Sequence, residues 1–392
     1  MGLKGCSKCE REAEKPGRLG RWLSPFPRPD LLLEQRMARR REGSESPSAP
    51  TRGRAYRFLQ RAKEERFPIM SFGTLGLMKK GNDSKVTEFV LLGLSSSWKL
   101  QLFIFLIFLL LYVAIVLGNL LILVTVRADA HLLQSPMYYF LGHLSFIDLC
   151  LSCVTVPKML GDFLQQNKTV SFLGCMAQIY FLHFLGASEM FLLTVMAYDR
   201  YVAICNPLHY LTIMNRQLCL QLVFACWCGG FIHSITQVIL VIQLPFCGPN
   251  ELDNFYCDVP QVIKLACMDT YMVEVLMISN SGLLSLVCFL VLIFSYAVIL
   301  ITLRTRFCQG RSKALSTCAS HLTVVSLIFV PCVFIYLRPF YSFSVDKAVS
   351  VFYTTITPML NPLIYTLRNG DVKNAMKRLW SHKFSLKEKQ KR

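Results

Sequence analysis

Two carboxylates interrupt long apolar stretches of this chain, and they are the residues best placed to do chemistry. Asp148 lies in the middle of one stretch, and Glu189 lies inside the next. Charged groups inside apolar segments are expensive, so they usually serve a function. Two carboxylates facing one interior would hold a cation or share a proton, or would belong to a polar network that only holds helices together. Asn119 and Asn361, in two further stretches, would join the same network in either case.

An adjacent acid and base, Asp199-Arg200, stand at the end of the third apolar stretch. The guanidinium carries a fixed fork of hydrogen-bond donors, so an Asp–Arg pair at a membrane face can pair in one state and release in another. The alternative is an arginine that only extends its charge to the membrane surface. We therefore treat the pair as a candidate switch.

Four of the 16 cysteines form a separate group. Many of the others lie inside apolar stretches, where a thiol behaves as a small buried hydrophobe. Cys175 begins the third stretch, and Cys247, Cys257 and Cys267 follow the fourth. Four cysteines on an oxidising face allow three pairings. The pattern predicts disulfides here without choosing among the pairings.

Seven apolar stretches position these residues. Each has about 20 residues or more, which as a helix spans the roughly 30 Å of a hydrocarbon core. Backbone groups in lipid must be satisfied internally, so continuous stretches of this length predict helices rather than barrel strands. The predicted spans are 102–126, 137–160, 176–197, 218–240, 273–300, 319–337 and 348–367. The expected fold is an all-α, seven-transmembrane helix bundle with a short amphipathic C-terminal helix.

Charge sets the expected orientation in the membrane. The chain is 53% hydrophobic and 17% charged, less charged than the roughly 25% of soluble proteins. Residues 1–77 and 368–392 carry most of the +18 net charge, so no basic folded surface is left for nucleic acid. Positively charged loops favour the cytoplasm. They are the loops that contain Arg127, Arg200, Arg216, Arg304, Arg306, Arg311 and Lys313. This places the N-terminus outside and the C-terminus inside.

The chain divides into three parts. Residues 1–77 are basic and rich in Pro, Gly and Ser, which predicts a disordered extension, and Met78 offers an alternative start. Residues 78–367 would form the seven-transmembrane domain, and residues 368–392 a basic cytoplasmic tail. Asn82 lies in an Asn-Asp-Ser sequon on the outer side, which predicts glycosylation.

Four motifs in register with these spans resemble the olfactory receptors, a family of rhodopsin-like G-protein-coupled receptors. They are PMYYFL at 136–141, MAYDRYVAIC at 196–205, KALSTCASH at 313–321 and PMLNPLIYTLRN at 358–369. The resemblance covers about residues 78–382. Together the motifs are more specific than any one of them, because other rhodopsin-like receptors share variants of several.

The resemblance implies a mechanism in which an odorant binds from outside, the inner face opens to a stimulatory G protein, and cyclic AMP rises. It implies the disulfides Cys175–Cys257 and Cys247–Cys267, and a sodium site at Asp148 and Glu189. The implied switch and coupling residues are Asp199, Arg200, Tyr201, Tyr296, Lys313, His321 and Tyr365. The receptor would act at the plasma membrane and would not be an enzyme.

Helical stepping from Arg200 and Tyr296 predicts the inward-facing positions of an odorant pocket. They are His183, Gly186, Ala187, Met190, Asn280, Ser281 and Leu284, and the sixth and seventh spans add Phe329, Cys332, Val333, Tyr336 and Thr354. Such a site is apolar with a few polar groups, which suits a small volatile with one hydrogen-bonding group. For any single position, ordinary helix packing is an equally good interpretation.

Two other classes of function, a receptor for a different ligand and a transporter, explain the sequence less well. An amine receptor would need an acidic residue at the position of Leu182, and a retinal protein would need a lysine near Thr354 and Thr355. A transporter would show internal repeats or several charges at the membrane midplane. The sequence shows no repeat and two such carboxylates, and its loops carry no catalytic or metal-binding spacing.

Overall fold

A computed structural model describes residues 86–379, except 96, 248, 307–310, 338–344 and 369. The chain separates into two units, residues Met1–Lys79 and Lys80–Arg392. The expected disordered extension, the alternative start at Met78 and the sequon at Asn82 all lie outside the described residues. Everything that follows concerns the second unit.

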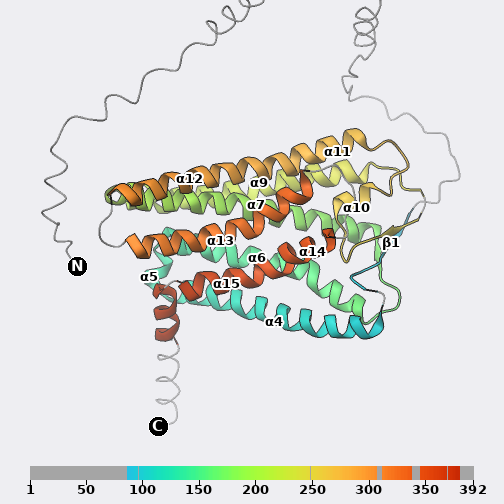
Figure 1. The fold of residues 1–392 in the computed structure, drawn as a ribbon, viewed down its shortest axis with the longest axis horizontal. Helices are drawn as coiled ribbons and strands as arrows, with labels where there is room; N and C mark the ends of the chain where they lie inside the picture. Colours follow the sequence, from blue (N-terminus) through green and yellow to red (C-terminus); the bar gives the residue numbers. More distant parts are fainter. Residues whose placement is uncertain are drawn as a thin grey trace, which may run out of the picture. The chain divides into compact units, whose positions relative to one another are not determined.

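Long helices lying side by side make up this unit (Figure 1). Six of those in the described part are long and apolar enough to cross a membrane, and they are six of the seven predicted spans. The helices are α4 (Trp98–Ala128), α6 (Pro136–Phe163), α7 (Phe172–Cys205), α9 (Arg216–Ile242), α11 (Tyr271–Met277) leading into α12 (Leu284–Arg306), and α13 (Arg311–Tyr336). The seventh span is continuous helix from α14 (Asp346–Val351) to α15 (Thr357–Arg368). The predicted all-α membrane bundle is confirmed.

The helices begin before and end after most of the apolar runs that predicted them. The apolar run measures the lipid-covered length, whereas capping groups set where the helix begins. The Ser171 hydroxyl accepts a hydrogen bond from the Gly174 N–H at 3.1 Å, and the Asn215 side chain accepts one from the Leu218 N–H at 2.9 Å. These polar caps start α7 and α9 a few residues ahead of their apolar cores.

A small three-stranded sheet, which the sequence did not predict, covers one end of the bundle. Its strands are β1 (Glu88–Leu91), β2 (Thr169–Ser171) and β3 (Glu251–Leu252), in the order β2-β1-β3. β1 runs antiparallel to β2 and parallel to β3. We call this end the sheet end. α7 starts beside β2 and carries Arg200 near its far terminus, so we call the opposite end the Arg200 end.

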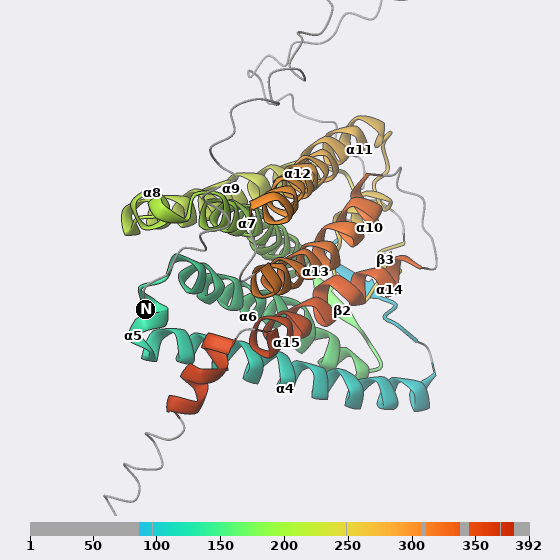
Figure 2. The same cartoon turned by 60° about the vertical axis from the view of Figure 1, so that its left-hand side comes forward.

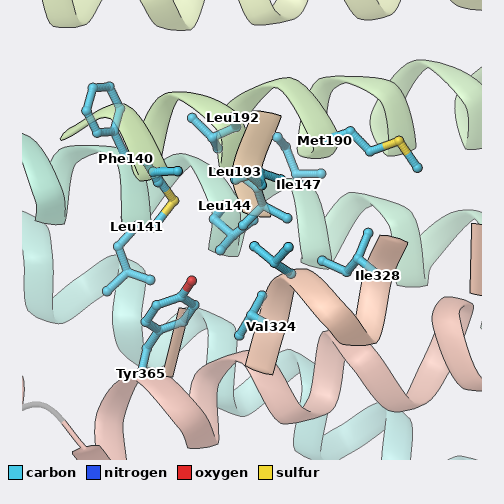
Figure 3. Packing of buried hydrophobic residues seen from close by; sticks show 14 of the residues in the cluster. Phe140, Leu141, Leu144, Ile147, Met190, Leu192, Leu193, Val324, Ile328 and Tyr365 are labelled. Atoms are coloured by element: carbon cyan, nitrogen blue, oxygen red, sulfur yellow. The ribbon is translucent and has the colours of Figure 1, made fainter. Parts of the chain in front are cut away.

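An apolar core joins the two ends. Side chains from α6, α7, α13 and α15 point toward one another in it, including Leu144, Leu193, Val324 and Tyr365 (Figure 3). Large apolar side chains on the outer surface are exposed instead, as at Leu110 of α4, which is 71% exposed. Lipid covers such side chains in a membrane, so the bundle is apolar both inside and outside.

Two spans contain a turn of π-helix. One is η2 (Ile278–Leu283), between α11 and α12, and the other is η3 (Phe352–Ile356), between α14 and α15. A π-turn adds a residue to the turn, so the positions before it are rotated relative to a regular helix. This rotation decides which side chains of both spans face the interior.

A short helix over residues 370–379 follows α15 and turns away from the bundle axis (Figures 1 and 2). Its buried side chains, Val372 and Ala375, lie on one face, and Lys373 and Arg378 are exposed. This pattern is the amphipathic C-terminal helix that the sequence predicted.

Candidate functional site

A cavity of about 70 Å³ lies inside the bundle near the sheet end. Residues of α6, α7, α9, α12, α13 and the η turns line it, together with two residues of the loop after α9. The lining residues are Leu151, Leu182, His183, Gly186, Ala187, Glu189, Met190, His233, Tyr256, Asp258, Ser281, Leu284, Ser285, Ile328, Cys332, Tyr336 and Tyr353. We call it the central cavity. This volume is well below the roughly 300–1,000 Å³ of typical small-molecule pockets, so an odorant must displace side chains to enter.

Eight of the twelve positions predicted for an odorant pocket line this cavity. They are His183, Gly186, Ala187, Met190, Ser281, Leu284, Cys332 and Tyr336. All four α7 positions are among them, because α7 is a regular helix and stepping from Arg200 follows its inward face without error.

The other four predicted positions do not line the cavity. The Asn280 side chain, inside η2, donates to the His233 backbone carbonyl at 3.5 Å, whereas Ser285 of α12 lines the cavity. In η3, Thr354 is buried and donates to the Ser350 carbonyl at 2.7 Å, whereas its neighbour Tyr353 faces the cavity. Stepping by regular helical turns could not include these π-turns.

Phe329 and Val333 of α13 also lie outside the lining. Phe329 is fully buried and stacks on Phe289, with ring centroids 5.9 Å apart. Ile328, one residue earlier, takes the cavity position instead. On α13 the prediction was therefore correct for Cys332 and Tyr336 and wrong for Phe329 and Val333.

The loop after α9 supplies two lining residues that the sequence prediction missed, Tyr256 and Asp258. They flank Cys257, which is bonded to Cys175 at the start of α7 with a Cα–Cα distance of 5.4 Å. The Gln178 side chain also accepts a hydrogen bond from the Cys257 N–H at 2.8 Å. Their position beside a bridged cysteine was the signal that could have identified them, since the bridge holds both residues over α7.

A second disulfide lies within the same loop. It joins Cys247 to Cys267 with a Cα–Cα distance of 5.7 Å. Both bonds are the pairs that the family resemblance implied. A cross-link restricts the unfolded chain, so these two bonds favour a single ordered arrangement of the loop over the cavity.

Asp258 is the charged group of this loop that faces the cavity. Its Oδ1 accepts hydrogen bonds from the Tyr336 hydroxyl at 3.2 Å and the Val259 N–H at 2.9 Å, and its Oδ2 accepts one from the Tyr256 hydroxyl at 3.3 Å. Burial raises the pKa of Asp258 to about 6, although these donors oppose the shift. Burial also raises the pKa of the Tyr256 phenol. The carboxyl therefore titrates close to physiological pH.

Two histidines add polar groups to the cavity. The rings of His183 and His233 lie 5.6 Å apart, and His183 lies 5.9 Å from the ring of Tyr336. His233 Nδ1 is buried and has no hydrogen-bond partner among the described residues. The lining includes no lysine or arginine. The cavity therefore offers hydrogen-bonding groups but no fixed cation for an anionic ligand.

Leu182 also lines the cavity, at the position where an amine receptor would need an acid. Thr354 and Thr355, where a retinal protein would need a lysine, are both fully buried. The structure thus places an apolar side chain and two hydroxyls where those two alternatives require charged or reactive groups.

A polar layer lies deeper in the bundle. The Asn361 amide donates to both oxygens of Asp148, at 3.1 and 3.0 Å, and the Asn119 amide donates to the Pro358 carbonyl at 3.1 Å. Glu189 interacts with Asp148. Three buried side-chain oxygens, Asn119 Oδ1, Glu189 Oε1 and Asn361 Oδ1, accept no hydrogen bond within the described residues.

These oxygens fit a hard cation such as sodium, which prefers oxygen ligands. The described residues contain no group of three or more His, Cys, Asp or Glu side chains that could hold a metal. Two carboxylates and two amide oxygens would therefore have to supply such a site. In this structure Asp148 and Glu189 belong to a polar network that links α6, α7 and α15, and this role does not need a sodium ion.

The predicted switch lies at the Arg200 end. Arg200 forms an ion pair with Asp199, and Asp199 also accepts a hydrogen bond from the Tyr210 hydroxyl at 2.7 Å. Tyr201 is half-buried beside this pair, on the same turn of α7. Tyr210, which the sequence prediction did not include, therefore stabilises the ion pair between Asp199 and Arg200.

The remaining switch residues lie on α12, α13 and α15. The Tyr296 hydroxyl hydrogen-bonds to His321 Nδ1, and both side chains are buried. The Tyr365 hydroxyl is buried without a partner among the described residues. Lys313 belongs to α13, but its side chain lies outside the described part of the structure.

Comparison with known proteins agrees with this architecture. A family model described as "Olfactory receptor" matches residues 108–383. Olfactory receptor 4Q3 of Homo sapiens is 86% identical over 302 residues, covering 77% of this chain and 96% of that receptor. Olfactory receptor 4Q2 of Homo sapiens is 60% identical over 304 residues, covering 77% and 96%, and olfactory receptor 4E2 of Mus musculus is 59% identical over 298 residues, covering 76% and 96%. The chain belongs to the olfactory receptor family and is a multi-pass, G-protein-coupled odorant receptor rather than an enzyme.

Proposed function

We propose that this receptor binds a small neutral odorant in the central cavity and activates a stimulatory G protein, which raises cyclic AMP. The observation that carries the proposal is the continuity between the cavity and the switch. Met190 and Ile328 line the cavity and belong to the same packed core as Tyr365, which lies toward the Arg200 end (Figure 3). A ligand that displaces these side chains therefore acts directly on the packing around the switch.

In this mechanism the odorant binds the open state more tightly than the closed state. The closed state holds Arg200 in its ion pair with Asp199, and Tyr210 supports that pair. Repacking of α12 and α13 in the open state would free the arginine and expose a surface for the G protein. Tyr296, Lys313, His321 and Tyr365 would adjust with those helices.

The positive loops support an orientation with the Arg200 end in the cytoplasm and the sheet end outside the plasma membrane. The disulfides at the sheet end agree with an oxidising exterior. We also propose that sodium bound at Asp148 and Glu189 stabilises the closed state, because the unpartnered oxygens beside them would be satisfied by a cation.

An odorant panel on cells expressing the full chain, with cyclic AMP as the readout, tests the proposal. Arg200→Ala is expected to abolish the response while surface expression persists. Lys99→Gln is the matched control, since it removes an exposed positive charge from the opposite end of the bundle. A normal response from Arg200→Ala would contradict the coupling mechanism. A response through calcium without cyclic AMP would contradict the choice of G protein.

A further inference from the structure

A second cavity, which we call the lateral cavity, lies between helices on the outer face of the bundle. Its volume is about 370 Å³, within the range of roughly 300–1,000 Å³ typical of small-molecule pockets. The residues that line it are Leu123, Val126, Arg127, Leu133, Tyr139, Gly142, His143, Phe146 and Trp227. They come from α4, α5 (Ala130–Leu133), α6 and α9, and none of them is a predicted site residue.

The surface around the lateral cavity is apolar. Val124 of α4 is 56% exposed, Phe146 of α6 is 47% exposed and Phe224 of α9 is 70% exposed. In a multi-pass membrane protein such side chains contact acyl chains. Ligands of the lateral cavity therefore come from the membrane. An odorant, in contrast, arrives from solution.

Aromatic side chains inside the cavity carry unused polar groups. The ring of Trp227 lies edge-on to Phe146 with centroids 6.3 Å apart, and Tyr139 lies edge-on to His143 with centroids 4.8 Å apart. Within the described residues, neither the Trp227 indole N–H nor the Tyr139 hydroxyl has a hydrogen-bond partner. Aromatic rings with a polar edge suit the ester region of a lipid, where apolar and polar groups meet.

Two arginines give this region its charge. Arg127 lines the cavity, and the charge of Arg216, the first residue of α9, acts on Tyr139. No Asp or Glu belongs to the lining. Both arginines are exposed. Two cations beside an apolar cavity favour an anionic amphiphile.

The carboxylate nearest to Arg127 in the sequence is already engaged. Asp129 accepts hydrogen bonds from Arg378 Nε at 3.1 Å and Nη2 at 2.5 Å, and from the N–H groups of His131 and Leu132. The Arg378 guanidinium holds the pKa of Asp129 below its usual value. Asp129 thus stays ionised and paired with the C-terminal helix, which leaves Arg127 without that partner. Figure 2 shows α5 joining α4 to α6 at this end of the bundle.

We propose that the lateral cavity binds an anionic phospholipid, with its phosphate at Arg127 and Arg216 and an acyl chain against the aromatic side chains. The lipid would bridge α4, α6 and α9. This site is separate from the odorant cavity, and its existence does not depend on the signalling mechanism. If the Arg200 end faces the cytoplasm, the site lies in the leaflet that is rich in anionic lipid.

The test uses the full chain reconstituted in nanodiscs of phosphatidylcholine, with phosphatidylglycerol added in increasing amounts. Retained lipid is measured by native mass spectrometry, and thermal stability is measured in parallel. We expect preferential retention of phosphatidylglycerol and a higher midpoint of thermal unfolding. Each of Arg127→Gln and Arg216→Gln should weaken the apparent affinity about fivefold, because a basic side chain near an anionic lipid surface contributes roughly that factor.

Gly142→Leu should exclude the acyl chain. A Cβ at Gly142 would meet only Val126 Cγ1, at the ordinary contact distance of 3.8 Å, so the first carbon of the new side chain fits and the rest would extend into the cavity. The control is Arg304→Gln, which removes one exposed charge from α12, away from the cavity. Arg304→Gln should retain the lipid as the wild type does.

Three results would overturn the proposal. Equal retention of phosphatidylcholine and phosphatidylglycerol by the wild type would show no anionic site. A loss with Arg304→Gln equal to that with Arg127→Gln would show a general effect of charge. Displacement of phosphatidylglycerol by cholesterol would assign the cavity to a sterol. If Gly142→Leu does not fold, the two arginine variants still decide among these results.

Discussion

The central cavity and the lateral cavity differ in the chemistry of their lining residues, and their volumes alone would not reveal this difference. The central cavity is smaller, about 70 Å³ against about 370 Å³. Yet it contains Asp258, Glu189 and two histidines, which are costly to bury, whereas the lateral cavity is lined mainly by aliphatic and aromatic side chains and has one arginine, Arg127. Buried polar groups without full hydrogen bonding lower stability and are retained where they serve a function.

The two cavities also differ in their connection to the switch. The central cavity lies between α7, α12 and α13, whose side chains continue into the core that reaches Tyr365 (Figure 3). The lateral cavity opens among lipid-facing side chains, and of its lining Val126 belongs to that core while Tyr139 and Trp227 pack against it. Under the two proposals above, the ligand of the small cavity drives signalling, while the ligand of the large one supports the bundle.

The largest expected effect is at Gly230, on α9 near both regions. A Cβ there would lie 2.1 Å from Ser188 Oγ and 2.6 Å from the Phe184 backbone carbonyl, so α7 and α9 would have to separate. Gly230→Ala should destabilise the receptor by about 3 kcal/mol, the upper end for overpacked cores. Thermal unfolding of the purified receptor measures this, with Gly142→Ala as the control. Equal midpoints for the two variants would contradict close packing at Gly230.

A pair of glycine substitutions separates the roles of the cavities. Gly186 lines the central cavity, and a Cβ there meets nothing within 4 Å. Gly186→Leu should fill the cavity and weaken the odorant response by about 5- to 150-fold, the range for overpacking a site. Phosphatidylglycerol retention should not change.

Gly142→Leu should show the opposite pattern, losing bound lipid and keeping odorant potency at equal surface expression. Concentration–response curves and lipid retention are measured on both variants. If Gly186→Leu leaves the response intact, the central cavity is not the odorant site.

Asp258 makes the central cavity sensitive to pH. Its pKa of about 6 lies above the ordinary value of 3.8, so the unfolded state releases this proton more readily than the folded state. The contribution of Asp258 to stability is complete below about pH 4 and is lost as pH rises through 6. Between pH 5 and 7.4 the free energy of unfolding should therefore fall by about 1–2 kcal/mol from this group.

Asp258→Asn should remove that dependence, as measured by thermal unfolding across this pH range. Asp253→Asn is the control, because Asp253 lies in the same loop but is exposed beside Lys347. The same pH profile in wild type and Asp258→Asn would rule out this titration.

The smallest effect tests the rotation at η2. Ser281 faces the central cavity, whereas Asn280 contacts α9. Ser281→Ala should change odorant potency by a few-fold, since one hydrogen bond contributes about 0.5–1.5 kcal/mol. Asn280→Ala should leave potency almost unchanged at equal surface expression. The reverse ranking in a concentration–response assay would contradict the assignment of Ser281, rather than Asn280, to the central cavity.

The sequence predicted the membrane spans and their order because hydrocarbon imposes a strong requirement on composition and length. It also located the Asp199–Arg200 ion pair, whose role as a switch stays a prediction, and the four α7 positions that line the central cavity, since α7 is a regular helix. These predictions needed only the helical repeat and the cost of charge in lipid.

Other features depended on tertiary structure. The π-turns η2 and η3 rotate Asn280 and Thr354 away from the cavity, and no periodicity in the sequence marks them. The sequence left three pairings open for the four cysteines, and the fold brings Cys175 beside Cys257, which places Asp258 over the cavity. Residues from α4, α5, α6 and α9 meet around the lateral cavity only after the helices pack.

By itself, then, the sequence determined which segments enter the membrane, where the charged groups stand along them, and which family motifs they carry. Tertiary structure alone decided which side chains share a cavity, because contacts between distant segments depend on helix rotation and on the packing of neighbouring helices. One extra residue in a helical turn rotates the side chains beyond it by about 100°. The amino-acid composition carries no information about that rotation.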